Sequence, residues 1–232
     1  MKRVLRQKNG FSLIEIAIVL LVVGLLSAGV MKGYDLLKQA RLRNAATQLT
    51  TIRLAYTRFK ARFSALPGDW SDARRMFSQT KSGNGNGLLE GHPLTPFSEP
   101  SLFWQHLMLS GMLKDMPLFK GDHASLQVGN SAGVLVPESP LGCGLFACTN
   151  PDSNLAGTFI LLARANDPSK PALTPHDAHA LDHILDDGLP LRGNVQARGT
   201  PGDRGACIRN GHYNLSHKRA ACFLFINLDE SF

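Results

Sequence analysis

One residue of this sequence stands out for the chemistry it could do: Glu15, an acid inside an apolar stretch. Residues 11–31 hold no other charge, and a stretch of this length is close to the ~20 residues that a helix needs to cross about 30 Å of hydrocarbon. An acid there costs on the order of 2–3 kcal/mol even on lenient insertion scales. A carboxylate kept at such a cost is a candidate functional group, and pairing with a buried cation is the chemistry open to it.

Basic residues precede the apolar stretch. The first ten positions hold four of them and no acid, namely Lys2, Arg3, Arg6 and Lys8. By the positive-inside bias they predict a cytoplasmic N-terminus, with the chain beyond the apolar stretch on the other side of the membrane. They also account for four of the seven net positive charges, so the remainder carries only +3. That balance does not indicate nucleic-acid binding.

The apolar stretch has three interpretations. It can be a secretory signal peptide, with the small residues at 27–29 as a cleavage site, or a plain membrane anchor. Both leave Glu15 unexplained. In the third interpretation residues 8–15, Lys-Asn-Gly-Phe-Ser-Leu-Ile-Glu, form a processing signal. They resemble the cleavage and methylation signal of type IV prepilins and type II secretion pseudopilins, which has a short basic leader ending in Gly, an aromatic first mature residue and Glu at the fifth mature position.

This resemblance implies that a prepilin peptidase cuts between Gly10 and Phe11 on the cytoplasmic face, that the helix is retained, and that Phe11 is N-methylated. Cleavage creates an ammonium group at Phe11 that is buried when subunits assemble. A buried charge is tolerated only when it is paired. We therefore expect Glu15, from a neighbouring subunit, to pair with Phe11 and to set the axial register.

Four cysteines form a second group of chemically capable residues: Cys143, Cys148, Cys207 and Cys222. A domain outside the cytoplasm lies in an oxidising compartment, where cysteine pairs are usually disulfides. Three connectivities are possible. We favour the local pairs Cys143–Cys148 and Cys207–Cys222 over the other two and over a four-thiolate zinc site, whose ligand spacing is irregular here.

Residues 82–87, Ser-Gly-Asn-Gly-Asn-Gly, echo the first half of a calcium loop. The first position lacks Asp, however, and Pro93 stands where the bidentate Glu belongs, so we expect a flexible glycine loop. Asp182, Asp186 and Asp187 are weak calcium candidates. The resemblance adds that the major pseudopilin of the secretion systems uses calcium in its C-terminal region. A helix end followed by a turn is the simpler interpretation, and we expect no cofactor.

Three histidines, His176, His179 and His183, fall on one face of a short predicted helix. The last two, four residues apart, have the spacing to bind a transition metal. A solvated helix face is the simpler interpretation. The sequence contains no nucleophile elbow, phosphate loop or zincin motif, so we do not expect an enzyme.

The chemically capable residues must be positioned by one long helix and a mixed head. Apolar residues from Leu42 to Phe63 recur at spacings of three and four, which predicts an amphipathic helix that continues the apolar stretch to about Ala65. Pro67 ends it. That apolar seam packs either on the head or on identical helices of other subunits. Further helices are predicted at 99–113 and 174–186, and strands at 133–136, 157–163 and 221–228.

This layout predicts an α+β fold that is pilin-like, with a long N-terminal helix, membrane-spanning in its first half, packed on an antiparallel sheet in a loop-rich head. The predicted segments are a cleaved leader at 1–10, a transmembrane and filament-core helix at 11–31, its amphipathic continuation at 32–65 and a periplasmic head at 66–232.

The function expected from this resemblance is that of a structural subunit, a minor one, of a type IV pilus or a type II secretion pseudopilus. Its expected partners are the prepilin peptidase, other pilin or pseudopilin subunits and an inner-membrane assembly platform, with no nucleic acid. The expected location is the bacterial inner membrane, with the head in the periplasm, and then the pilus or pseudopilus. The alternative is a helix-anchored surface-binding module, an adhesin or a DNA-uptake tip.

Overall fold

No proline occurs before Pro67, and the described residues before it form a single helix from Leu13 to Phe63. The computed structural model describes residues 12–114, 136–200, 202 and 205–229. It divides into two compact units, residues 1–40 and 41–232. The elements in chain order are α1 Leu13–Phe63, α2 Ala73–Met76, α3 Glu99–Leu109, β1 Gly144–Thr149, β2 Thr158–Ala163, α4 Pro175–Leu185, β3 Val195–Gly199, β4 Ile208–Arg209, β5 His212–Tyr213 and β6 Cys222–Asn227.

Helix α1 is 51 residues long, which confirms the continuous helix predicted from the apolar periodicity. In the first unit its large apolar side chains, from Leu13 to Leu37, are exposed. Among the described residues α1 is the one helix long and apolar enough to cross a membrane by length and composition. Such a surface is stable only when lipid or other helices cover it.

In the second unit, residues 41–63 of α1 form the centre of the head. The seam predicted from the sequence is buried there at Leu42, Ala45, Leu49, Ile52, Tyr56 and Phe59, and its last member, Phe63, is half-buried. They share one core cluster with residues of the sheet, α3 and α4. The interpretation that places the seam against the head is therefore correct. Because the compact unit begins at Arg41, it includes helix residues that the sequence-based division assigned to a separate segment.

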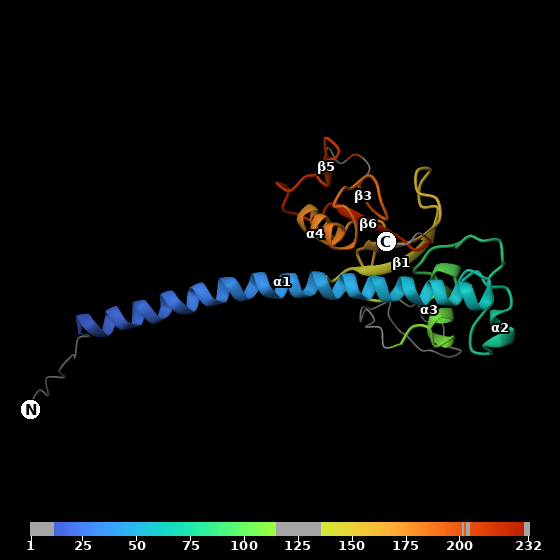
Figure 1. The fold of residues 1–232 in the computed structure, drawn as a ribbon, viewed down its shortest axis with the longest axis horizontal. Helices are drawn as coiled ribbons and strands as arrows, with labels where there is room; N and C mark the ends of the chain where they lie inside the picture. The colour runs from blue at the N-terminus through green and yellow to red at the C-terminus, as the bar shows by residue number, and fades with distance from the viewer. Residues whose placement is uncertain (1–11, 115–135, 201, 203–204, 230–232) are drawn as a thin grey trace, which may run out of the picture. The chain divides into compact units, whose positions relative to one another are not determined.

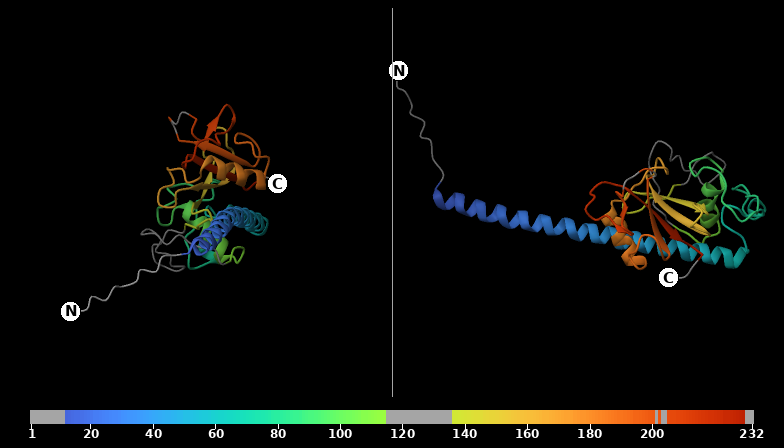
Figure 2. Two further views of the ribbon diagram at one scale, coloured as in Figure 1. Left: turned by 90° about the vertical axis from the view of Figure 1, so that its left-hand side faces the viewer. Right: turned by 90° about the horizontal axis from the view of Figure 1, so that it is seen from above.

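The sheet has four antiparallel strands in the order β1-β2-β6-β3, and it lies beside the C-terminal part of α1 (Figures 1 and 2). Side chains alternate between its faces. On β6, Leu224 and Ile226 join the core shared with α1, whereas Phe223 and Phe225 join a second cluster on the other face. Both faces are thus covered, and this explains why β6 is apolar at nearly every position.

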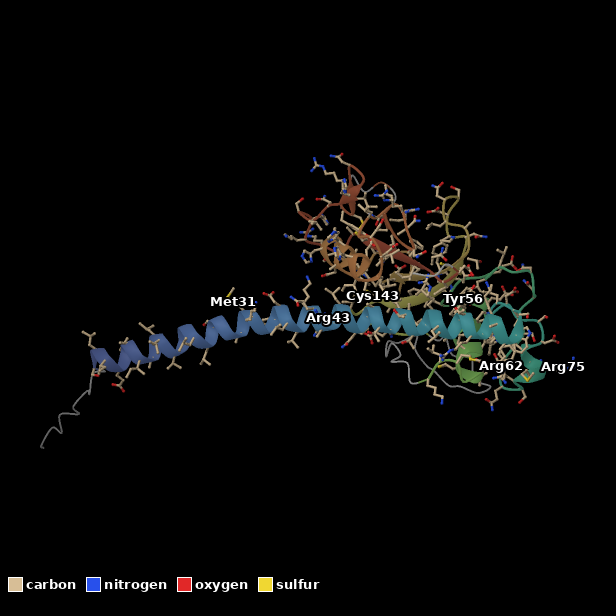
Figure 3. The ribbon with its side chains drawn as sticks, in the orientation of Figure 1. Met31, Arg43, Tyr56, Arg62, Arg75 and Cys143 are labelled. Atoms are coloured by element: carbon tan, nitrogen blue, oxygen red, sulfur yellow. A yellow bond between two sulfur atoms is a disulfide. The ribbon has the colours of Figure 1, made fainter. Side chains whose placement is uncertain are left out.

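The C-terminal end of the sheet is tied to α1 by one carboxylate. Asp229 accepts hydrogen bonds from the Tyr56 hydroxyl at 2.6 Å and from the backbone N–H of Thr158 at 2.6 Å, and it pairs with Lys60 at 2.9 Å. Tyr56 lies where α1 meets the sheet (Figure 3). These contacts join helix, β2 and the C-terminal segment in the head.

The structure forms the predicted Cys207–Cys222 disulfide, which joins the residue before β4 to the first residue of β6. In the chain-entropy model a loop of this size contributes about 3 kcal/mol.

The other predicted disulfide is wrong, because Cys143 and Cys148 are free thiols. Cys143 immediately precedes β1 and Cys148 lies within it. Five residues of extended chain separate them by roughly 16 Å, and they join the clusters on opposite faces of the sheet. Burial raises the pKa of both thiols to about 12.

The predicted strands at 157–163 and 221–228 correspond to β2 and β6, and the predicted helix at 174–186 corresponds to α4. Thr174 caps α4 as its sequence indicates, since its side chain accepts the N–H of Asp177. Most of the predicted strand at 133–136 lies outside the described residues.

Candidate functional site

Glu15 lies in the first turn of α1, where the helix begins. Its backbone N–H donates to Ser12 Oγ at 3.2 Å, and the Ser12 N–H donates to Glu15 Oε2 at 3.4 Å. This reciprocal pair is a capping box, which satisfies two N–H groups at the helix end. Sequence reasoning missed this role of Ser12, although Ser and Glu three positions apart are the signature of the motif. Gly10 and Phe11, predicted for processing and assembly, lie outside the described residues.

A comparison with family models matches residues 5–31 to the prokaryotic N-terminal methylation motif. The chain carries a prepilin-type cleavage and methylation motif. Comparisons with curated proteins and with solved structures found no match. With the long N-terminal helix, the motif indicates a type IV pilin-like or pseudopilin-like subunit. It implies processing by a prepilin peptidase and assembly with pilins, and it fits anchoring in the inner membrane before assembly.

In the head, the glycine-rich loop encloses a carboxylate. Asp69 is only 3% exposed. It accepts the backbone N–H groups of Gly85 at 2.6 Å, Asn86 at 3.2 Å and Gly87 at 2.6 Å. The positive φ values of Gly85 and Gly87, 78° and 83°, let successive amides point inward in a nest that binds anions. The loop therefore binds an anion of its own chain, in place of the calcium ion considered from the sequence.

A second buried acid holds the continuation of this loop. Glu99, at the start of α3, accepts the N–H of Asn84 at 3.0 Å and the N–H of Glu90 at 2.8 Å. The amide oxygens of Asn84 and Asn86 accept N–H groups two residues further on. The oxygens that a cation would use are thus occupied by the backbone. Hydrogen bonds to Asp69 and Glu99 order the segment that the sequence predicted to be flexible.

His106 joins this loop region to α3. It is fully buried, its Nδ1 accepts the Gly68 N–H at 2.9 Å, and its Nε2 lies 3.0 Å from the Lys81 carbonyl oxygen. Because the amide must donate to Nδ1, the ring proton sits on Nε2. Burial lowers the pKa of His106 to about 4, and the Lys81 carbonyl opposes this shift. The neutral ring fits the site, whereas a protonated ring would turn Nδ1 into a second donor facing the amide.

We expect His106 to make the head acid-sensitive. Its folded pKa of about 4 lies below the unfolded value of about 6.5, so its contribution is complete above pH 6.5 and is lost as the pH falls toward 4. The loss is on the order of 3 kcal/mol. The measurement is the free energy of unfolding of wild type and His106→Gln at pH 7 and pH 4. The difference between the two proteins should shrink at pH 4, and a constant difference would contradict the assignment.

The comparison with His106→Gln is needed because titration of Asp182 changes the free energy of unfolding in the opposite direction. Burial raises the pKa of Asp182 to about 6 in the folded protein, whereas its pKa in the unfolded chain is near 4. Ionised Asp182 therefore destabilises the fold above pH 6, and the free energy of unfolding rises as the pH falls from about 6 to about 4. The wild-type profile alone therefore mixes two contributions. As a control, His92→Gln removes an exposed imidazole, and its free energy of unfolding should stay close to that of the wild type.

The three calcium candidates lie together at the end of α4. Carboxylate oxygens of Asp182, Asp186 and Asp187 lie within 4.8 Å of one another. Each already accepts hydrogen bonds. Asp182 binds the Tyr213 hydroxyl at 2.7 Å and the Gly188 N–H at 3.1 Å. The other two bind backbone N–H groups of the segment that follows the helix. The cluster thus fits the end of a helix and its following turn, as the simpler interpretation of the sequence predicted.

Proposed function

We propose that this protein is a minor structural subunit of a type IV pilus or a type II secretion pseudopilus, processed between Gly10 and Phe11 and assembled through α1. The observation that carries the proposal is the motif at residues 5–31. Glu15 lies in the first turn of a helix whose large apolar side chains are exposed from Leu13 to Leu37. A subunit of this kind performs no chemistry, and its work is assembly.

In this proposal residues 1–10 are a leader that the prepilin peptidase removes on the cytoplasmic side. Residues 11–31 span the inner membrane, and the head lies in the periplasm until the subunit is extracted into the filament by an inner-membrane platform. Two features support this orientation. The basic residues of the leader precede the apolar stretch, and the Cys207–Cys222 disulfide is typical of an oxidising compartment.

The proposal predicts the mature N-terminus. Mass spectrometry of the protein from cells that contain a prepilin peptidase should find a chain that begins with methylated Phe11. Deletion of the peptidase should return the full-length chain. Asn9→Ala is the matched control, since it changes a leader residue that none of the three features of the processing signal includes. A mature chain that begins near Val30, or that retains Met1 in the presence of the peptidase, would contradict the proposal.

A further inference from the structure

Helix α4 carries two histidines whose rings face the same space. His179 and His183 are four residues apart and thus lie on one face of the helix. Their ring centroids are 6.2 Å apart, with an angle of 59° between the ring planes. His183 is exposed and His179 is half-buried. The pair is therefore accessible from solvent on one side and supported by the head on the other.

Both rings converge on the backbone of Gly188. A methyl group at that glycine would lie 3.6 Å from His179 Nε2 and 3.5 Å from His183 Cδ2. Gly188 has a φ of +74°, a conformation that disfavours any other residue. The glycine thus keeps open the space beside both imidazoles.

The ring nitrogens of this pair differ from those of His106. His106 uses both nitrogens in hydrogen bonds at 2.9 and 3.0 Å. Within the described part of the chain, no hydrogen bond involves a ring nitrogen of His179 or His183. Burial lowers the pKa of His179, and the nearby His183 and His176 lower it further. A ring nitrogen that makes no hydrogen bond has its lone pair available to a metal ion when the imidazole is neutral.

The support beneath His179 orients its ring. Tyr213 packs edge-on against it, with centroids 5.5 Å apart and planes at 73°. The Tyr213 hydroxyl is in turn held by Asp182 at 2.7 Å, and α4 is anchored in the core by Ala178 and Leu181. A ligand whose orientation is already fixed loses less entropy on binding.

We propose that His179 and His183 together bind one divalent transition-metal ion that prefers imidazole ligands, such as Cu²⁺ or Zn²⁺. Imidazole nitrogen suits these ions, and Cu²⁺ forms the stronger complexes. Two protein ligands leave coordination positions open for water or for a donor from another molecule. This binding capacity goes beyond the structural role of the subunit and does not depend on processing or assembly.

The test is isothermal titration calorimetry of the full-length protein in detergent micelles, purified without a histidine tag, with CuCl₂ as the titrant at pH 7.5 and glycine as a weak competitor. Mutation of groups that merely orient metal ligands costs about 10–100-fold in affinity, so loss of a ligand should cost at least about tenfold. We expect that loss for His183→Ala and for His179→Gln. The matched control is His176→Ala, which removes another exposed histidine of α4 and should change the affinity less than about twofold.

Thermal unfolding of each variant separates loss of a ligand from loss of the fold. His183 is exposed, so His183→Ala should unfold at the wild-type temperature and still bind Cu²⁺ weakly. The proposal is overturned if His183→Ala and His179→Gln retain wild-type affinity. It is equally overturned if His176→Ala loses as much affinity as they do, because the pair would then not be the site.

Discussion

Glu15→Leu is expected to leave the protein in the membrane and to remove it from filaments. Leucine is more favourable than glutamate in a membrane-spanning helix, so insertion should be preserved or improved. In the assembled filament, however, the ammonium of processed Phe11 would lose its proposed partner. Removing one member of a buried ion pair costs about 3–5 kcal/mol, since the remaining charge stays buried. A penalty of this size at each subunit contact corresponds to a loss of incorporation by at least about two orders of magnitude.

The measurement compares the amount of the variant in the membrane fraction with the amount in filaments sheared from the cells or isolated with the assembly apparatus. Ser27→Ala is a suitable control. It also removes a polar group from the same helix, but one whose hydroxyl only donates to the Val23 carbonyl oxygen. It should be incorporated like the wild type. Normal incorporation of Glu15→Leu would show that the proposed Phe11–Glu15 pair does not set the register.

The capping box offers a second explanation for a loss of incorporation in Glu15→Leu. The Glu15 side chain accepts the Ser12 N–H at 3.4 Å, and loss of this contact alone should fray the first turn. Replacing a cap typically costs about 1 kcal/mol. Ser12→Ala removes the other half of the capping box and leaves the carboxylate in place. If capping were the only role of Glu15, both variants would reduce incorporation equally, whereas the proposed ion pair requires a much larger effect for Glu15→Leu.

The sequence allowed the long helix to be predicted because all its determinants are local. The seam from Leu42 to Phe63 repeats at helical spacing, and Pro67 ends the uninterrupted region. Strands β1 and β3 were not predicted, because their stabilisation is non-local. Residues Val195–Gly199 alternate polar residues with valine, alanine and glycine, and they become a strand by pairing with β6. Such a segment carries little propensity of its own.

The candidate sites also differ in whether their determinants are local in the sequence. Glu15 could be recognised because one charge in an apolar stretch is visible without any structure. The Cys143–Cys148 error arose because proximity in sequence was taken for proximity in space, although an extended strand separates residues at this offset. The role of Asp69 was not accessible, since its partners are backbone N–H groups 16–18 residues away. Backbone groups are common to every residue, so side-chain identity alone does not reveal them.

Asp69→Ala should destabilise the head more than any exposed substitution near it. The change removes the carboxylate from the N–H groups of Gly85, Asn86 and Gly87. The Gly87 N–H is then left without an acceptor, whereas the Gly85 N–H still donates to the Asp69 carbonyl oxygen and the Asn86 N–H to Asn84 Oδ1, both at 2.9 Å. An unsatisfied buried donor costs about 1–3 kcal/mol, and part of this cost is recovered where the loop opens to water. With one donor left unsatisfied and two hydrogen bonds to a charged group lost, we expect a loss of about 2–4 kcal/mol in the free energy of unfolding. Asp69→Asn keeps one acceptor oxygen and should fall between the alanine variant and the wild type.

Chemical denaturation of the wild type and the variants measures this effect, and hydrogen exchange of the Gly85 and Gly87 amides locates it. The control is Asp72→Ala, three residues away, because Asp72 is exposed and its side chain makes no cap hydrogen bond to α2. That variant should stay within about 0.5 kcal/mol of the wild type. If Asp69→Ala were as mild, the hydrogen bonds to its carboxylate would contribute little, and the order of the glycine loop would have to come from the Glu99 contacts instead. Faster exchange at Gly85 and Gly87 in Asp69→Ala, with Asp72→Ala unchanged, distinguishes these two explanations.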